Sequence, residues 1–181
     1  LENNGLVDGA RREQMIVSVG VIKFDDGVKM VRYYTNDDGY IQVEVHGDFE
    51  DINITDVTLW YFSDSEGIGT KAAWEDELSD VSKPVYEYEV EDDEFIEYTR
   101  AINDIDDTVN IAATEVGETT TGEKFAVDHF YMIYERKISD PEVFELLMVS
   151  CEERVIRNGL DHKLAYLIGY QISSNDFSII S

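Results

Sequence analysis

Short runs of alternating apolar residues, separated by glycine turns, constrain the fold of this chain more than any other feature. Residues 16–45 contain three such runs, with an Asp-Asp-Gly segment at 25–27 and an Asn-Asp-Asp-Gly segment at 36–39 between them. In the third run, Ile41, Val43 and Val45 alternate with more polar neighbours, as in a half-buried antiparallel strand. The pattern predicts a β-meander.

The same reading predicts two hairpins in the middle of the chain. Strands are expected at 85–90 and 95–102, and again at 109–116 and 125–138. Before them, residues 57–62 form a further expected strand and 63–69 a loop. A brief helix is expected over 71–80, ending before Pro84, with Trp74 and Leu78 on its inner face.

The C-terminal third allows two interpretations. The Ser-Asp-Pro-Glu segment 139–142 is typical of a helix start and Gly159 of a helix stop, whereas residues 144–151 are nearly continuously apolar, as in a fully buried strand. The continuous run favours the strand. Further strands are expected at 164–172 and 177–180.

These elements predict the fold class. We expect an α+β, mostly β protein, in which antiparallel hairpins and a meander form one or two packed sheets with one or two short helices. A chain of 181 residues with 43% hydrophobic residues is expected to form a single domain over 1–181. Residues 1–14 are polar and are expected to be a flexible N-terminal segment.

The charge of the chain restricts its partners. Forty acidic residues against fourteen basic ones give a formal net charge of −26, spread along the sequence. Because nucleic-acid binding depends on clustered Lys and Arg, the charge argues against a nucleic-acid partner. The remaining partners are cations, neutral molecules and basic proteins, although a solubilising or salt-adapted surface is the simpler interpretation.

Cysteine usage and hydropathy indicate a compartment. Cys151 is the only cysteine, so no internal disulfide can form, and a cytoplasmic location is expected. No apolar run reaches about 18 residues, so no transmembrane segment is expected. Cys151 lies within an apolar run and is expected to pack as an inert thiol.

Two sequence patterns resemble a known family. The pattern Tyr-Thr-x-Asp-Asp-Gly-x-x-Gln-Val occupies 34–43, and His-x-x-x-x-Tyr-x-Arg occupies 129–136, with Pro-Val-Tyr-Glu-Tyr at 84–88 between them. Together these segments resemble a YjfK-like bacterial family of unknown function. The resemblance implies an accessory role in a bacterial envelope-stress or membrane-associated system, and it implies no catalytic residues.

Two familiar motifs fail on closer comparison. The turn at 36–39 has the carboxylates of a calcium loop, but Tyr34 and Val45 occupy positions where an EF-hand needs carboxylate ligands, so a plain hairpin turn is expected. Residues 67–72 match a loose dinucleotide-binding pattern, Gly-x-Gly-x-x-Ala. The carboxylates of Asp64 and Glu66 would repel a pyrophosphate, and the hairpin that follows is not a crossover unit. We therefore predict no cofactor.

Three scattered histidines give a weak metal signal. His46, His129 and His162 lack the spacing of a helical zinc site, so a structural role is expected for each and no metal is predicted. Clustered acids such as Asp104, Asp106 and Asp107 leave weak calcium binding open. Arg136 ends an apolar row and is expected to form a structural ion pair with a carboxylate.

The candidate binding residues are therefore Asp37, Asp38, His129, Tyr134 and Arg136, and no catalytic residue is predicted. We expect a non-catalytic binding or adaptor protein that turns its acidic surface toward a basic or membrane-associated protein partner. The alternative is a metal-dependent enzyme or small-molecule-binding module that uses His129 and nearby carboxylates. Polyamine or divalent-cation binding by the acidic surface is a third possibility.

Overall fold

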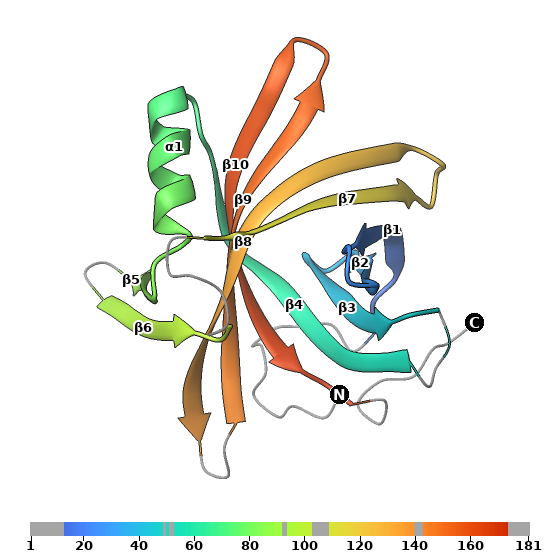
Figure 1. Cartoon of the computed structure of the whole chain (residues 1–181), viewed down its shortest axis with the longest axis horizontal. Coiled ribbons are helices and arrows are strands. Elements are labelled where there is room, and N and C mark those ends of the chain that lie inside the picture. Colours follow the sequence, from blue (N-terminus) through green and yellow to red (C-terminus); the bar gives the residue numbers. More distant parts are fainter. Residues whose placement is uncertain are drawn as a thin grey trace. The chain divides into compact units, whose positions relative to one another are not determined.

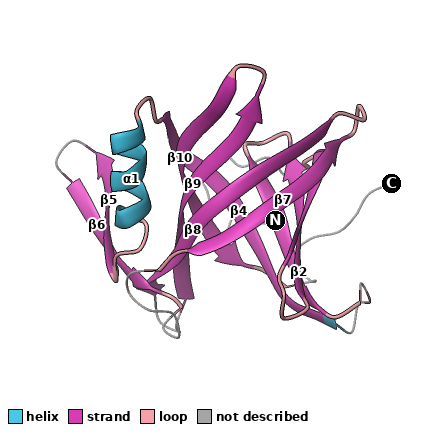
Figure 2. Ribbon diagram, turned by 45° about the horizontal axis from the view of Figure 1, so that its top comes forward, coloured by secondary structure: helices cyan, strands magenta, loops and turns pink. Residues whose placement is uncertain are grey.

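Antiparallel strand pairing accounts for most of the chain, as the sequence predicts (Figures 1 and 2). The structure is a computed structural model and describes residues 13–48, 50, 53–91, 94–102, 109–139 and 143–173. The elements are β1 Ile16–Lys23, β2 Val28–Thr35, β3 Gly39–His46, β4 Ile54–Gly67, α1 Lys71–Asp80, β5 Val85–Glu91, β6 Glu94–Arg100, β7 Ile111–Thr119, β8 Lys124–Ser139, β9 Val143–Ile156 and β10 Gly159–Gln171.

The chain divides into two compact units. Unit 1 comprises residues 1–61, 115–125 and 170–181, and unit 2 comprises residues 62–114 and 126–169. The boundary falls within long strands, so that β4, β7, β8 and β10 each contribute residues to both units. The expectation of a single domain stays a prediction.

Unit 1 contains the predicted meander. Strands β1, β2 and β3 pair antiparallel in sequence order, the first part of β4 pairs with β3, and residues 115–119 of β7 pair with β1. The buried face of β3 differs from the expectation at Ile41 and Val43 but agrees with it at Val45, which is 4% exposed. Tyr40 and Gln42 are 1% and 5% exposed, whereas Ile41 and Val43 are only partly buried. A polar side chain is tolerated on this face because Gln42 has a hydrogen-bonding partner there, Arg32.

In unit 2, β5, β6, β8, β9 and β10 follow one another as antiparallel neighbours. One face of these strands carries the hydrophobic core, to which α1 contributes Trp74. The buried members of this core are Trp74, Val81, Tyr98, Met132, Tyr134, Leu147, Val149, Cys151 and Leu164. The opposite face is buried as well, with His129, Tyr131, Ser150 and Glu152 each less than 5% exposed.

Helix α1 begins and ends where its sequence indicates. The Thr70 hydroxyl caps the helix by accepting a hydrogen bond from the Ala73 amide at 3.2 Å. Pro84, which cannot donate a helical hydrogen bond, follows the last turn. This is the one helix in the part of the chain described, and it is not long and apolar enough to cross a membrane.

The strand interpretation of the C-terminal third is confirmed, since β9 covers 143–156 and β10 follows it. The loop expected at 63–69 is wrong, because β4 continues to Gly67. Residues 63–67 are all exposed and polar or small, so they carry no apolar alternation that would reveal a strand. The expected strand at 177–180, the N-terminal segment up to residue 12, and Asp104, Asp106 and Asp107 lie outside the described residues.

Cys151 provides a test of this core. It is fully buried on β9, and burial raises the pKa of its thiol to about 12. We expect alkylation of the folded protein at pH 8 to be at least about a hundredfold slower than in urea, because the reagent must wait for the strand to open. The rate can be measured with iodoacetamide and mass spectrometry, with Cys151→Ser as the unlabelled control. Equal rates in the two conditions would show that β9 is not a core strand.

Candidate functional site

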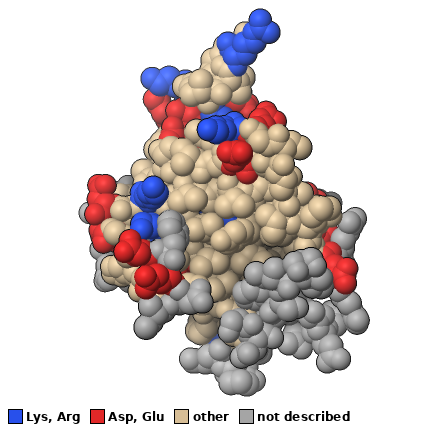
Figure 3. Space-filling view, turned by 90° about the vertical axis from the view of Figure 1, so that its right-hand side faces the viewer, with Lys and Arg blue, Asp and Glu red and all other residues tan. Residues whose placement is uncertain are grey.

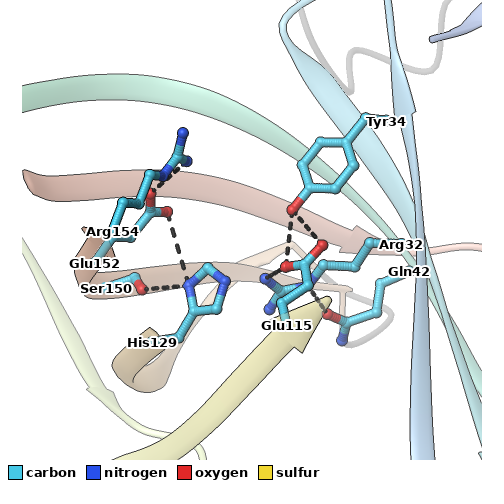
Figure 4. A network of polar contacts seen from close by, with 8 residues as sticks. All are labelled: Arg32, Tyr34, Gln42, Glu115, His129, Ser150, Glu152 and Arg154. Atoms are coloured by element: carbon cyan, nitrogen blue, oxygen red, sulfur yellow. Dashed lines mark hydrogen bonds and ion pairs between the residues drawn. The ribbon is translucent and has the colours of Figure 1, made fainter. Parts of the chain in front are cut away.

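A buried ion pair organises the polar groups of unit 1 (Figure 4). Arg32 on β2 and Glu115 on β7 are 2% and 0% exposed, and the guanidinium Nη1 lies 2.9 Å from the carboxylate Oε2. The Tyr34 hydroxyl donates to the same carboxylate at 2.9 Å, and Arg32 Nε donates to Gln42 Oε1 at 3.0 Å. Arg32 also lies over the Tyr40 ring, 4.9 Å from its centroid. The charges are thus held by hydrogen bonds and by an aromatic face.

Strand register explains how these residues meet. Gly20 on β1 lies opposite both Arg32 on β2 and Gly117 on β7. Because Gly20 has no side chain, the Glu115 carboxylate can lie over β1, where a Cβ at Gly20 would overlap Glu115 Oε1. A Cβ at Gly117 would instead meet the Phe125 ring and the Val19 carbonyl oxygen. Gly20 therefore makes the space in which the ion pair forms. Burial raises the pKa of Tyr34 well above its usual value, so its hydroxyl remains a donor at physiological pH.

A second polar cluster in unit 2 surrounds His129 (Figure 4). His129 on β8 lies opposite Glu152 on β9. Its Nδ1 is 3.4 Å from the Ser150 hydroxyl and 3.8 Å from Glu152 Oε1. Arg154 donates to the other oxygen of Glu152 at 3.0 Å. The side chains of His129 and Glu152 are almost fully buried, whereas that of Arg154 is half exposed.

The geometry around His129 does not match a nucleophilic triad. In a triad, the nucleophile and the carboxylate contact opposite nitrogens of the imidazole. Here Ser150 and Glu152 both approach Nδ1, so the imidazole cannot relay a proton between them. A hydrogen-bonded core histidine is the role that these contacts support.

The other two histidines differ in their surroundings. His162 Nε2 lies 2.7 Å from Glu153 Oε2, and its ring stacks on Trp74 at a centroid distance of 4.3 Å. His46 is exposed at the end of β3. Within the described ranges, no group of three or more His, Cys, Asp or Glu side chains is arranged to hold a metal ion.

Tyr134 and Arg136 are structural in unit 2. The buried Tyr134 hydroxyl donates to the carbonyls of Val81 and Lys83, at 2.8 and 2.9 Å, and burial raises its pKa to about 12. Arg136 forms the ion pair predicted for it, with Nη2 2.5 Å from Glu145 Oε1. The Tyr98 hydroxyl donates to the same Glu145 oxygen at 2.7 Å. Tyr134 and Arg136 therefore both stabilise unit 2 through contacts with other residues of the same unit.

Asp37 and Asp38 occupy the turn between β2 and β3. Asp38 has a left-handed backbone with φ of 47°, a conformation that Asp tolerates better than most residues. The Asp37 carboxylate accepts a hydrogen bond from the Gln14 amide at 3.3 Å, and the same amide donates to the Tyr61 hydroxyl at 2.9 Å. These contacts fit the hairpin turn expected from the sequence. The structure places Asp37 and Asp38 in unit 1 and His129, Tyr134 and Arg136 in unit 2.

The dinucleotide-like segment at 67–72 follows a strand directly, because β4 ends at Gly67 and α1 begins at Lys71. The next strand, β5, pairs antiparallel with β6. A dinucleotide site needs a parallel crossover at this point, whereas the antiparallel hairpin expected from the sequence follows.

No sequence pattern singles out Arg32, Glu115, Ser150 or Glu152. The available signal for the ion pair was Gly20, since glycine within a strand often marks a close approach. Nothing in the sequence indicates which carboxylate fills the space, because Arg32 and Glu115 are 83 positions apart.

An acidic face lies on the β5–β6 hairpin of unit 2. Glu87 on β5 is directly opposite Glu97 on β6, and Glu89 is opposite Phe95. All four are exposed, Phe95 by 55%. Within the described part of the chain, no ion pair neutralises these three glutamates. We call Glu87, Glu89, Phe95 and Glu97 the hairpin face.

Elsewhere on the surface, in the view of Figure 3, charged side chains of the described residues stand in separate groups with uncharged surface between them.

Comparison with known proteins gives a family match over nearly the whole chain. Residues 1–178 match the family described as "Protein of unknown function (DUF2491)". The chain is also 22% identical over 153 residues to "Uncharacterized protein YjfK" of Escherichia coli (strain K12), covering 84% of this chain and 69% of that protein. The resemblance to a YjfK-like family is confirmed. No solved structure matches the chain.

The buried ion pair can be tested by removing one partner or both. We expect Arg32→Ala to lower the free energy of unfolding by about 3–5 kcal/mol, because the Glu115 carboxylate remains buried without its counter-charge. The double variant Arg32→Met, Glu115→Leu should lose much less, since neither charge is then buried. Urea unfolding followed by tryptophan fluorescence measures both. A single variant as stable as the wild type would contradict the pairing.

The space at Gly20 gives a separate test. Gly20→Ala should destabilise unit 1, because the added Cβ displaces the Glu115 carboxylate from Arg32. Gly69→Ala is the matched control, since a Cβ there meets no atom within 4 Å. In a Glu115→Ala background the cost of Gly20→Ala should largely disappear. An equal cost with and without the carboxylate, measured by thermal unfolding, would show that Gly20 serves another purpose.

Proposed function

Since the chain belongs to the DUF2491 family of proteins of unknown function, we propose its function from its own charge and surface. We propose a non-catalytic binding or adaptor protein of the cytoplasm, which presents exposed carboxylates to a basic protein partner. The envelope-stress or membrane-associated setting implied by the family resemblance is part of this proposal. It supplies a context in which such an adaptor would act.

The hairpin face carries the proposal. Like charges directly opposite each other on adjacent strands destabilise a sheet, and Glu87 and Glu97 stand in that relation. A Lys or Arg at one of the two positions would make the hairpin more stable, so the stability of the fold does not account for the two glutamates. A cationic partner that covers the hairpin face relieves the repulsion between them. These carboxylates therefore have a role in binding that they do not have in folding.

The net charge supports the same conclusion. A charge of −26 accelerates encounter with a basic partner by electrostatic steering and repels other acidic molecules. The charges of these two ion pairs do not compete for this role, because Arg32 pairs with Glu115 and Arg136 with Glu145 inside their own units. The exposed carboxylates are thus the groups left to meet a partner.

The alternative built on His129 has less support. Ser150 and Glu152 share one imidazole nitrogen, and Arg154 takes the second oxygen of the Glu152 carboxylate. These contacts satisfy the cluster internally and leave Glu152 poorly placed to bind a metal ion. We therefore place the function on the surface carboxylates.

The proposal predicts a partner whose capture depends on salt and on the hairpin face. Immobilised wild-type protein should recover a basic protein from bacterial lysate at about 0.01 M salt and lose it at about 1 M, where the Debye length falls to about 3 Å. The triple variant Glu87→Gln, Glu89→Gln, Glu97→Gln should recover less of it at low salt.

The matched control removes the same charge from unit 1. Asp25→Asn, Glu118→Gln, Glu123→Gln eliminates three exposed carboxylates and should leave capture close to that of the wild type. Failure to recover any partner at low salt, or capture that does not weaken with added salt, would refute the proposed function.

A further inference from the structure

The strand that carries half of the hairpin face is also an end strand. Within the described residues, β5 has β6 as its one hydrogen-bonded neighbour in the sheet order. An end strand has a row of main-chain N–H and C=O groups available for pairing with another chain. Figures 1 and 2 both show β5 beside β6.

The pairing pattern identifies which main-chain groups face outward. The Arg100 amide donates to the Pro84 carbonyl at 3.0 Å, which makes Val85 and Thr99 a pair that is not mutually hydrogen-bonded. By the alternation of an antiparallel ladder, the N–H and C=O groups of Val85, Glu87 and Glu89 then point away from β6.

A pocket lies beside these outward-facing groups. It has a volume of about 350 Å³ and is lined by Asp80, Lys83, Val85, Tyr86 and Glu87. The pocket therefore joins the edge of β5 to the last turn of α1. Two of its five lining residues, Val85 and Glu87, direct main-chain polar groups toward the open edge.

The pocket is suited to a cationic side chain. Asp80 and Glu87 provide carboxylates, and the helix ends here with the negative end of its dipole and without a basic residue in its last turn. The Lys83 ammonium lies 2.8 Å from Asp80 Oδ2, so Asp80 is already paired and Glu87 is the carboxylate of the pocket left to meet the cation of a partner. Burial and the neighbouring Asp80, Glu66 and Asp76 raise the pKa of Glu77, in keeping with a high density of negative charge along this side of α1.

From this placement we infer that an extended, basic segment of a partner protein adds as a strand to the edge of β5 that does not pair with β6, and places one cationic side chain in the pocket beside Glu87. The inference rests on the proposed function and specifies how the partner binds. Main-chain bonds to Val85, Glu87 and Glu89 supply affinity that is independent of sequence, and the carboxylates of the hairpin face select for Lys and Arg.

The test uses the whole wild-type chain and two peptides of equal charge. The probe is a capped peptide of alternating Arg and Thr, about seven residues long to match β5, and the control is the same peptide with N-methyl groups on alternate residues. N-methylation keeps the charge and removes the donors that strand pairing needs. We expect the unmethylated peptide to bind at least about tenfold tighter, because two or three net hydrogen bonds are lost from the control.

Hydrogen exchange and two variants locate the site. The amides of Val85, Glu87 and Glu89 should gain protection when the unmethylated peptide binds. Glu87→Pro removes a donor from the open edge without removing one from the β5–β6 ladder, and should weaken binding about tenfold more than Glu87→Gln, which removes only the charge.

The outcomes separate this inference from the proposed function. Equal affinity for the two peptides, or no protection of the β5 amides, would overturn strand addition and leave an acidic binding surface in place. No binding of either peptide would also overturn strand addition, while the salt-dependent capture of a lysate protein decides the proposed function by itself.

Discussion

The pairing of Arg32 with Glu115 is the contact on which the interior of unit 1 depends. Neither charge reaches water, so each would carry a large desolvation cost if the other were absent. The pair explains why a polar face of β3 is buried and why Gly20 has no side chain. It also links strands that are distant in the sequence, since β2 and β7 are both neighbours of β1 and meet above it through these side chains.

Unit 2 also buries polar side chains, because its long strands are buried on both faces. Along β9, Val149 and Cys151 join the hydrophobic core, and Ser150 and Glu152 lie on the opposite face. A strand with two buried faces needs partners for every polar side chain that it carries, and the contacts around His129 supply them. The polar residues of β9 are thus explained by packing and need no catalytic role.

The sequence predicts local structure well where turns and alternation coincide. The Asn-Asp-Asp-Gly turn, the brief helix before Pro84 and the strand in the apolar run 144–151 follow from residues close together in the chain. The sequence does not predict features that depend on contacts between residues far apart in the chain. The polar end of β4 has no apolar pattern, and the burial of Gln42 depends on a network that includes Glu115 from a distant strand. The same holds for the candidate residues. The acidic composition predicts that Arg136 forms an ion pair, but it does not predict that the partner is Glu145.

The attachment of the β5–β6 hairpin to β8 has a consequence for how this surface can change during evolution. Among the residues described, registered pairing with β8 involves Thr99 and Arg100 alone, and the rest of the hairpin is held by inward-facing tyrosines such as Tyr86. Outward-facing positions therefore contribute little to the core and tolerate substitution. The scaffold can therefore be retained while the outward-facing sequence of this hairpin changes.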